Sequence, residues 1–111
     1  MGAKPLFWLG SSRDGVRGFP DDARRAVGHE LYQVQQGLEP SSWKPMPSVG
    51  AEALELRVQT ERAFRVLYVA KFSEGIYVLH AFEKRTRRTR QADVALARKR
   101  MKDLEQWRKT R

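Results

Sequence analysis

The order of apolar and polar positions predicts four β-strands in this chain. Residues 6–9 form a short apolar run that ends at three small residues, and this predicts a first strand. Residues 54–60 alternate strictly, with Leu54, Leu56 and Val58 on one face and polar side chains on the other. Residues 64–72 and 76–84 are almost wholly apolar, which is typical of strands covered on both faces. The short links 61–63 and 73–75 predict that the last three strands form an antiparallel meander.

Two segments have the periodicity of amphipathic helices. Residues 20–36 begin with Pro20, Asp21 and Asp22, and both the proline and the two carboxylates suit a first helical turn. Residues 91–107 form the second predicted helix, with Thr89 as a candidate cap and a narrow apolar stripe that ends at Leu104. Residues 38–53, which follow the first helix, are rich in Pro, Ser and Gly, and this composition predicts a loop with room for a helical turn.

The order strand, helix, three strands, helix predicts an α+β domain. In that fold class, helices pack on an antiparallel sheet, here with the β-α-β-β-β-α order and with the helices on one side of it. The chain has 111 residues and 41% hydrophobic residues, so we expect residues 1–111 to form a single domain with its own core.

Composition narrows the chemistry that the chain can carry. There is no cysteine, which excludes a disulfide, an iron–sulfur site and a thiol nucleophile and is compatible with a reducing cytoplasm. Two isolated histidines, His29 and His80, do not make a zinc site, and no glycine-rich phosphate loop follows a strand. We therefore expect no metal and no cofactor. The first apolar run is too short for a signal peptide or a membrane span, so we also expect no membrane partner.

Positive charge is concentrated at the end of the chain. The formal net charge is +9, and residues 83–111 hold 12 of the 22 Lys and Arg residues but only four of the 13 acidic residues. Such a field attracts polyanions, and a basic stripe is the usual footprint of a nucleic-acid-binding protein. The alternative is a solvated basic helix without a partner. The cations that we expect to contact RNA are Arg87, Arg88, Arg98, Lys99 and Lys102.

Five side chains of the predicted meander are candidates for catalysis: Arg57, Arg65, His80, Lys84 and Arg85. If the strands pair as predicted, these groups converge at one edge of the sheet. Clustered cations suit a phosphodiester, because its transition state gathers negative charge on phosphoryl oxygens. An RNA 2′-hydroxyl can itself serve as the nucleophile, so no metal is needed.

Each candidate also has a structural interpretation. His80 in an apolar strand can be a hydrogen-bonded core histidine, and Arg57 can pair with Glu55 or Glu61 on the surface. Lys84 and Arg85 can be a solvated strand end. Arg65 is the hardest to explain structurally, since an arginine in an apolar strand needs a polar outlet.

Seven motifs, in order, resemble one known family, the phage-derived Gp49-like proteins. They are KPLFWLGSS (4–12), FPDDARRAVG (19–28), LYQVQQG (31–37), KPM (44–46), LELR (54–57), FRVLY (64–68) and YVLHAFEKRT (77–86). That family is similar to HigB-like toxins of the RelE/ParE superfamily. The resemblance covers nearly the whole chain.

The resemblance implies a compact, RelE-like fold of the microbial-RNase type and an mRNA endoribonuclease that acts on the ribosome without a metal. It also implies a hetero-oligomer with a cognate antitoxin, commonly a helix-turn-helix protein. Arg57 and Arg65 match the basic positions of the family on adjacent strands, and Lys84-Arg85 match the basic pair after the third strand. His80 matches a histidine common in this branch. The general base is left open between Glu55, His80 and Lys84.

Three functions are compatible with these features. The first is a toxin that cleaves mRNA and thereby inhibits translation. The second is a ParE-like toxin that inhibits DNA gyrase through protein contacts. The third is an inactive phage-derived module that binds nucleic acid without cleaving it. The cation cluster on the meander favours the first.

Overall fold

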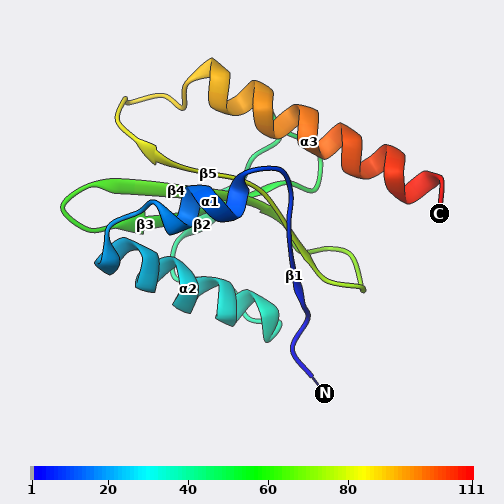
Figure 1. Cartoon of the computed structure of the whole chain (residues 1–111), viewed down its shortest axis with the longest axis horizontal. Helices are drawn as coiled ribbons and strands as arrows, with labels where there is room; N and C mark the ends of the chain where they lie inside the picture. The colour runs from blue at the N-terminus through cyan, green and yellow to red at the C-terminus, as the bar shows by residue number, and fades with distance from the viewer. Residues whose placement is uncertain (1) are drawn as a thin grey trace.

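The computed structural model describes residues 2–111 and contains one five-stranded sheet with three helices (Figure 1). The strands are β1 (Leu6–Trp8), β2 (Trp43–Pro45), β3 (Leu54–Gln59), β4 (Ala63–Val69) and β5 (Ile76–Lys84). The helices are α1 (Ser12–Arg17), α2 (Asp21–Gln35) and α3 (Gln91–Lys109). The strand order across the sheet is β1-β5-β4-β3-β2. The α+β class and the β3-β4-β5 meander are therefore confirmed.

The structure corrects five details of the predicted fold. The first strand pairs parallel with β5, because it enters the sheet beside the far strand of the meander rather than through a hairpin. Part of the predicted 38–53 loop is the edge strand β2, which pairs antiparallel with β3. The short helix α1 follows β1 directly where only a stop was predicted. The strand expected at 64–72 ends at Val69. The helix α3 begins after Arg90, and Thr89 does not cap it with its side chain.

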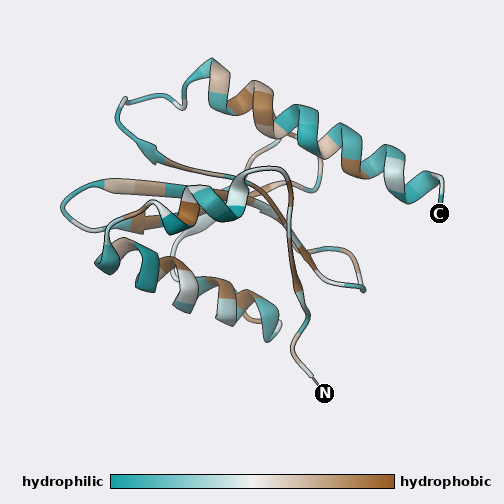
Figure 2. Ribbon diagram, viewed as in Figure 1, coloured by the Kyte–Doolittle hydropathy of each residue, from teal (hydrophilic) through white to brown (hydrophobic). Residues whose placement is uncertain are grey.

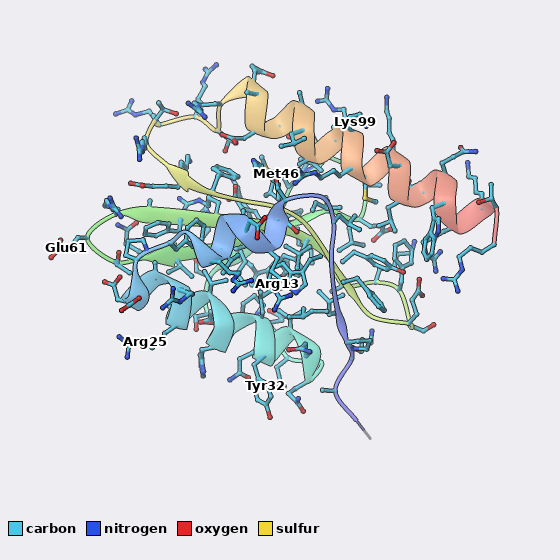
Figure 3. All side chains as sticks on the ribbon, in the orientation of Figure 1. Arg13, Arg25, Tyr32, Met46, Glu61 and Lys99 are labelled. Atoms are coloured by element: carbon cyan, nitrogen blue, oxygen red, sulfur yellow. The ribbon has the colours of Figure 1, made fainter. Side chains whose placement is uncertain are left out.

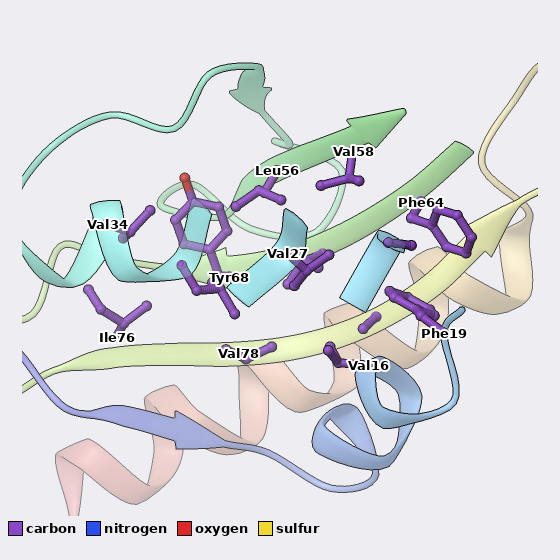
Figure 4. Close-up of a cluster of buried hydrophobic side chains, with 14 residues drawn as sticks. Val16, Phe19, Val27, Val34, Leu56, Val58, Phe64, Tyr68, Ile76 and Val78 are labelled. Carbon is purple, nitrogen blue, oxygen red and sulfur yellow. The ribbon is translucent and has the colours of Figure 1, made fainter. Parts of the chain in front are cut away.

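Helices cover both faces of the sheet, whereas one covered face was predicted. Alternating side chains of β4 explain why: Phe64, Val66 and Tyr68 pack against α1 and α2 (Figure 4), while Leu67 and Val69 pack against α3. Figure 2 shows the apolar stretches of the strands enclosed between the two helical layers. Two separate hydrophobic cores result, one on each face. No helix of residues 2–111 combines the length and the apolar character that crossing a membrane requires.

A β-bulge in β5 decides the direction of His80. Leu67 of β4 pairs with His80, but the next residue, Tyr68, pairs with Val78, so Leu79 is an extra residue in β5. A bulge places two consecutive side chains on the same face of a sheet. Leu79 and His80 consequently both face α3, and the alternation predicted for a regular strand is broken there.

The last turns of α3 are tied to the β4–β5 turn by a charged contact. Arg108 donates from Nε and Nη2 to the two carboxylate oxygens of Glu74, at 2.9 and 3.1 Å, and its guanidinium lies 3.6 Å from the centre of the Phe72 ring. Tyr77 donates to the same carboxylate at 2.9 Å. The hydrogen bonds from Arg108 are the largest cause that lowers the pKa of Glu74, to about 2.

A first prediction concerns this contact. A carboxyl whose pKa is lowered in the folded state stabilises the fold above its ordinary pKa of 4.5, and that contribution is lost as the pH falls through about 2. Arg108→Ala should return the pKa of Glu74 toward 4.5, and a carbon-13 NMR titration of the Glu74 carboxyl group measures this. Arg98→Ala, on another face of α3, is the control and should leave the midpoint low. A midpoint that stays near 2 in Arg108→Ala would contradict the assignment.

Candidate nucleic-acid interface

Cations from three separate segments line one groove of about 450 Å³, which we call the basic groove. Its wall contains Lys44 of β2, Lys84 at the end of β5, Arg87 and Arg88 of the following link, and Arg98 of α3. The other lining residues are Met46, Ser48, Thr89, Gln91 and Val94, so no carboxylate lies in the described wall. A groove with five cations and no anion is suited to a phosphate backbone.

The groove is shaped by contacts between the loop after β2 and the start of α3. Arg98 donates from Nε to the carbonyl oxygen of Ser48 at 2.9 Å, which fixes the helix against that loop. The Thr86 hydroxyl donates to the carbonyl oxygen of Arg88 and holds the link in a tight turn. Arg87 and Arg88 are thus presented by a folded link rather than by a free chain.

Lys84 lines the basic groove and is surrounded mainly by other cations. Burial is the largest cause that lowers the pKa of its ammonium group, and the charges of Arg65, Lys44 and Arg57 add to this, while Glu55 opposes it. An anion that entered the groove would offset this repulsion. The electrostatics of the chain itself therefore favour an anionic ligand at Lys84.

Next to the groove, a buried carboxylate holds three cations together. Glu55 has a side chain that is only 1% exposed, and its Oε1 lies 3.0 Å from Arg57 Nε, 3.7 Å from Arg65 Nε and 3.9 Å from Lys44 Nζ. We call Glu55, Lys44, Arg57 and Arg65 the Glu55 cluster. Arg57 and Arg65 are direct cross-strand partners, an arrangement in which like charges repel. Glu55 lies two residues before Arg57 in β3 and compensates that repulsion.

The Glu55 cluster is not fully satisfied. Glu55 Oε2 and Arg65 Nε are buried without any hydrogen-bond partner. Burial is also the largest cause that lowers the pKa of the Arg65 guanidinium. Arg57 and Arg65 line a different cavity, of about 450 Å³, together with Ser41, Ser42 and Gln59. The three predicted cations of the meander lie close to one another. Arg57 and Arg65 have an internal counter-ion, Glu55, whereas Lys84 lines the basic groove.

His80 is a nearly buried side chain that anchors α3. Its Nε2 lies 2.7 Å from Asp93 Oδ1, and the two side chains are only 12% and 11% exposed. The ring stacks on Phe82 at a centroid distance of 5.1 Å, and Arg90 donates to the other oxygen of Asp93 at 3.4 Å. This environment matches the structural interpretation of His80, since the ring is not part of the wall of the basic groove. Asp93, its partner, carried no signal in the sequence beyond its place in the first turn of a helix.

The remaining predicted cations are not all brought together. Arg85 is largely exposed, pairs with Glu83 at 3.3 Å and lines a small cavity beside Lys84 instead of the basic groove. Lys99 lies on another side of α3 (Figure 3), where it pairs with Asp103 at 3.0 Å. Lys102 is exposed and does not line the groove. Lys44, in the segment predicted to be a loop, does line the basic groove. Its position opposite Glu55 in the β2–β3 pair has no signal in the sequence.

Fold and groove together define a class: a small, basic α+β protein with a groove lined by cations. A family model described as phage-derived protein Gp49-like (DUF891) matches residues 14–102, from α1 into the second half of α3. The chain belongs to this Gp49-like family, which is a family of RelE/HigB-type toxins. A search of curated proteins finds no match.

Proposed function

We propose that this protein is the toxin of a type II toxin–antitoxin pair and that it cleaves mRNA, in the cytoplasm and on the ribosome, without a metal ion. The observation that carries the proposal is the basic groove, with Lys84 in its wall and the Glu55 cluster beside it. Membership of a toxin family supports the same role. The proposed partners are mRNA, the ribosome and a cognate antitoxin, which forms a hetero-oligomer with the toxin.

The proposed reaction uses the 2′-hydroxyl of the substrate as nucleophile. Lys84, Arg87 and Arg88 would hold phosphates on both sides of the scissile bond in the basic groove. The Arg57 and Arg65 guanidinium groups line the adjoining cavity, and they would stabilise the charge of the transition state where the RNA passes from the groove toward the Glu55 cluster. The 2′ oxygen attacks phosphorus, its proton passes to a base, and the 5′ oxygen leaves with a proton. Lys84, with its lowered pKa, is the candidate for proton transfer that lines the groove.

One observation favours a second candidate function. Arg57 and Arg65 are paired with Glu55, and His80 is paired with Asp93, so fewer groups are free for catalysis than the sequence suggested. The alternative is a protein that binds RNA through the same groove and does not cut it. A toxin of the ParE type, which inhibits gyrase through protein contacts, does not need the basic groove, so the groove gives no support to that function.

Induced expression with mapping of mRNA 5′ ends distinguishes these functions. The wild-type chain should arrest growth and create new mRNA ends, and co-expression of the adjoining gene should suppress both effects. Lys84→Ala and Arg65→Ala should each abolish cleavage and toxicity. Lys71→Ala, which removes an exposed lysine paired with Glu52, is the matched control and should remain toxic. Growth arrest with intact mRNA would contradict the nuclease proposal. A DNA-damage response would favour inhibition of DNA gyrase.

A further inference from the structure

A polar cavity lies beside the Glu55 cluster, between α2 and the edge of β3, and we call it the α2 cavity. Its volume is about 450 Å³, within the range of sites for small ligands. None of residues 2–111 lines both this cavity and the basic groove. The lining residues come from α2, from the loop before β2, and from β3 and β4: Ala26, Glu30, Ser41, Ser42, Arg57, Val58, Gln59 and Arg65.

Glu30 gives the α2 cavity a carboxylate that has no cationic partner among residues 2–111. It is only 9% exposed, and its Oε2 accepts a hydrogen bond from the Ser41 backbone N–H at 2.9 Å. The two arginines of the cavity wall, Arg57 and Arg65, pair with Glu55 instead. A carboxylate has about four acceptor positions on its two oxygens, so most of the hydrogen-bonding capacity of Glu30 is left for a ligand.

The edge of β3 adds a backbone donor to the same cavity. β2 pairs with β3 only as far as Leu56, and one further bond joins the Arg57 N–H to the Ser42 carbonyl oxygen at 3.0 Å. Alternate residues of an antiparallel strand direct their backbone groups toward the same neighbour. The Gln59 N–H is therefore directed toward this edge, where no strand in the described part of the chain pairs with it. β3 ends at Gln59, so the open edge is too short for a partner strand.

These groups fit a nucleobase better than a phosphate. The Glu30 carboxylate would repel an anion, and the two arginines already share Glu55, whereas a neutral ring with both donors and acceptors can bond to this wall. Guanine is the base that presents two adjacent donors, N1–H and the N2 amino group, beside an acceptor, O6. The two donors match the two oxygens of one carboxylate, and O6 matches an N–H group. Adenine and cytosine carry an acceptor where guanine has N1–H, and uracil has no amino group.

We propose that the α2 cavity binds a guanine base of the RNA strand that the basic groove holds, with the N1–H and N2 amino groups on Glu30 and O6 on the Gln59 N–H. The inference rests on the proposed function for RNA as the ligand. The two hollows adjoin at Glu55, whose Oε1 lies 3.9 Å from Lys44 Nζ of the basic groove and 3.0 Å from Arg57 Nε of the α2 cavity. A strand that continues past Lys44 is thus led to Arg57 and into the cavity.

Binding of short single-stranded RNAs that differ at one base tests this inference. The RNAs carry 2′-O-methyl groups, which remove the nucleophile and prevent cleavage. One guanine in an adenine background is compared with inosine, adenine, cytosine or uracil at the same place. The wild-type chain should bind the guanine RNA about tenfold more tightly than the adenine RNA, the discrimination expected of a bidentate base contact. Inosine, which lacks the N2 amino group, should bind with intermediate affinity.

Two variants and a control locate the contact. Glu30→Gln keeps an acceptor for the Ser41 N–H but loses the second oxygen, so it should bind the adenine RNA as the wild type does and show no preference for guanine. Ala26→Leu, one helical turn before Glu30, fills the cavity without removing a charged group and should also abolish the preference. Glu39→Gln is the matched control, because Glu39 is an exposed carboxylate bonded to Trp43 Nε1 that does not line the α2 cavity, and it should keep the preference.

The results separate this inference from the proposed function. A chain that prefers guanine in binding but never cleaves mRNA would refute the nuclease and leave the α2 cavity as a base site. Cleavage of mRNA by a chain that binds all five RNAs equally would leave the nuclease standing and overturn the inference. A preference for another base, or a guanine preference that survives in either Glu30→Gln or Ala26→Leu, would overturn it as well. A wild-type chain that binds none of the RNAs would overturn both proposals.

Discussion

Replacing Lys84, Arg88 and Arg98 together with alanine should weaken binding to single-stranded RNA by about two orders of magnitude. Charge-assisted hydrogen bonds contribute about 1.5–3 kcal/mol each when buried and less in an open groove, so three of them account for a loss of this size. Each phosphate contact also releases condensed counterions, with a salt slope of about −0.7 per contact on single strands. The slope should therefore fall in magnitude by about 2. Fluorescence anisotropy with a labelled RNA at several salt concentrations measures both quantities.

A triple variant that changes net charge equally is the appropriate control. Arg24→Ala, Arg25→Ala and Lys71→Ala remove three exposed cations from α2 and the β4–β5 turn, away from the basic groove. If attraction depended on overall charge alone, both triple variants would lose the same affinity and the same part of the salt slope. That result would remove the basic groove from the proposal.

Glu55→Ala should lower the free energy of unfolding by about 3–5 kcal/mol, the range expected when one partner of a buried ion pair is removed. Without the carboxylate, Arg57 and Arg65 remain directly opposite each other on neighbouring strands with no anion between them. Leaving Arg65 without an anion should lower the free energy of unfolding more than leaving Arg57 without one, because the Arg65 side chain is only 11% exposed. Urea unfolding followed by circular dichroism measures the change.

Two comparison variants separate the loss of the buried anion from other effects. Glu55→Leu combined with Arg65→Leu removes the buried charge on both sides and should recover most of the stability, since apolar replacement of a buried pair is often neutral. Glu52→Ala breaks the exposed pair with Lys71 and should cost no more than about 1 kcal/mol. If Glu55→Ala unfolded as the Glu52 variant does, Glu55 would not be the anion that holds the cluster together.

Local patterns were sufficient for most of the secondary structure. The strict alternation of 54–60 and the apolar runs of 64–72 and 76–84 predicted β3, β4 and β5, because the side chains of a strand repeat every two residues. The 20–36 and 91–107 segments predicted α2 and α3 to within two residues at each end, since Pro20, the first-turn carboxylates and the apolar spacing are all local signals. Short links then determined the meander, which places Arg57 beside Arg65.

Local patterns failed where a contact joined residues far apart in the chain. β2 is only three residues long and exists because its backbone pairs with β3, which places Lys44 opposite Glu55. A loop composition therefore concealed both the strand and a cation of the basic groove. The bulge at Leu79 turned His80 toward Asp93, a partner thirteen residues away on another element.

The sequence by itself determined that this protein has an α+β fold, a basic C-terminal quarter and an arginine-bearing meander, because these follow from periodicity, turn residues and charge counts. Only the tertiary structure decided which cations share a groove and which are neutralised. Whether Arg65 meets a phosphate or Glu55 depends on distances of a few ångströms between strands. Electrostatic energies change steeply over such distances, and residue order along a chain does not record them.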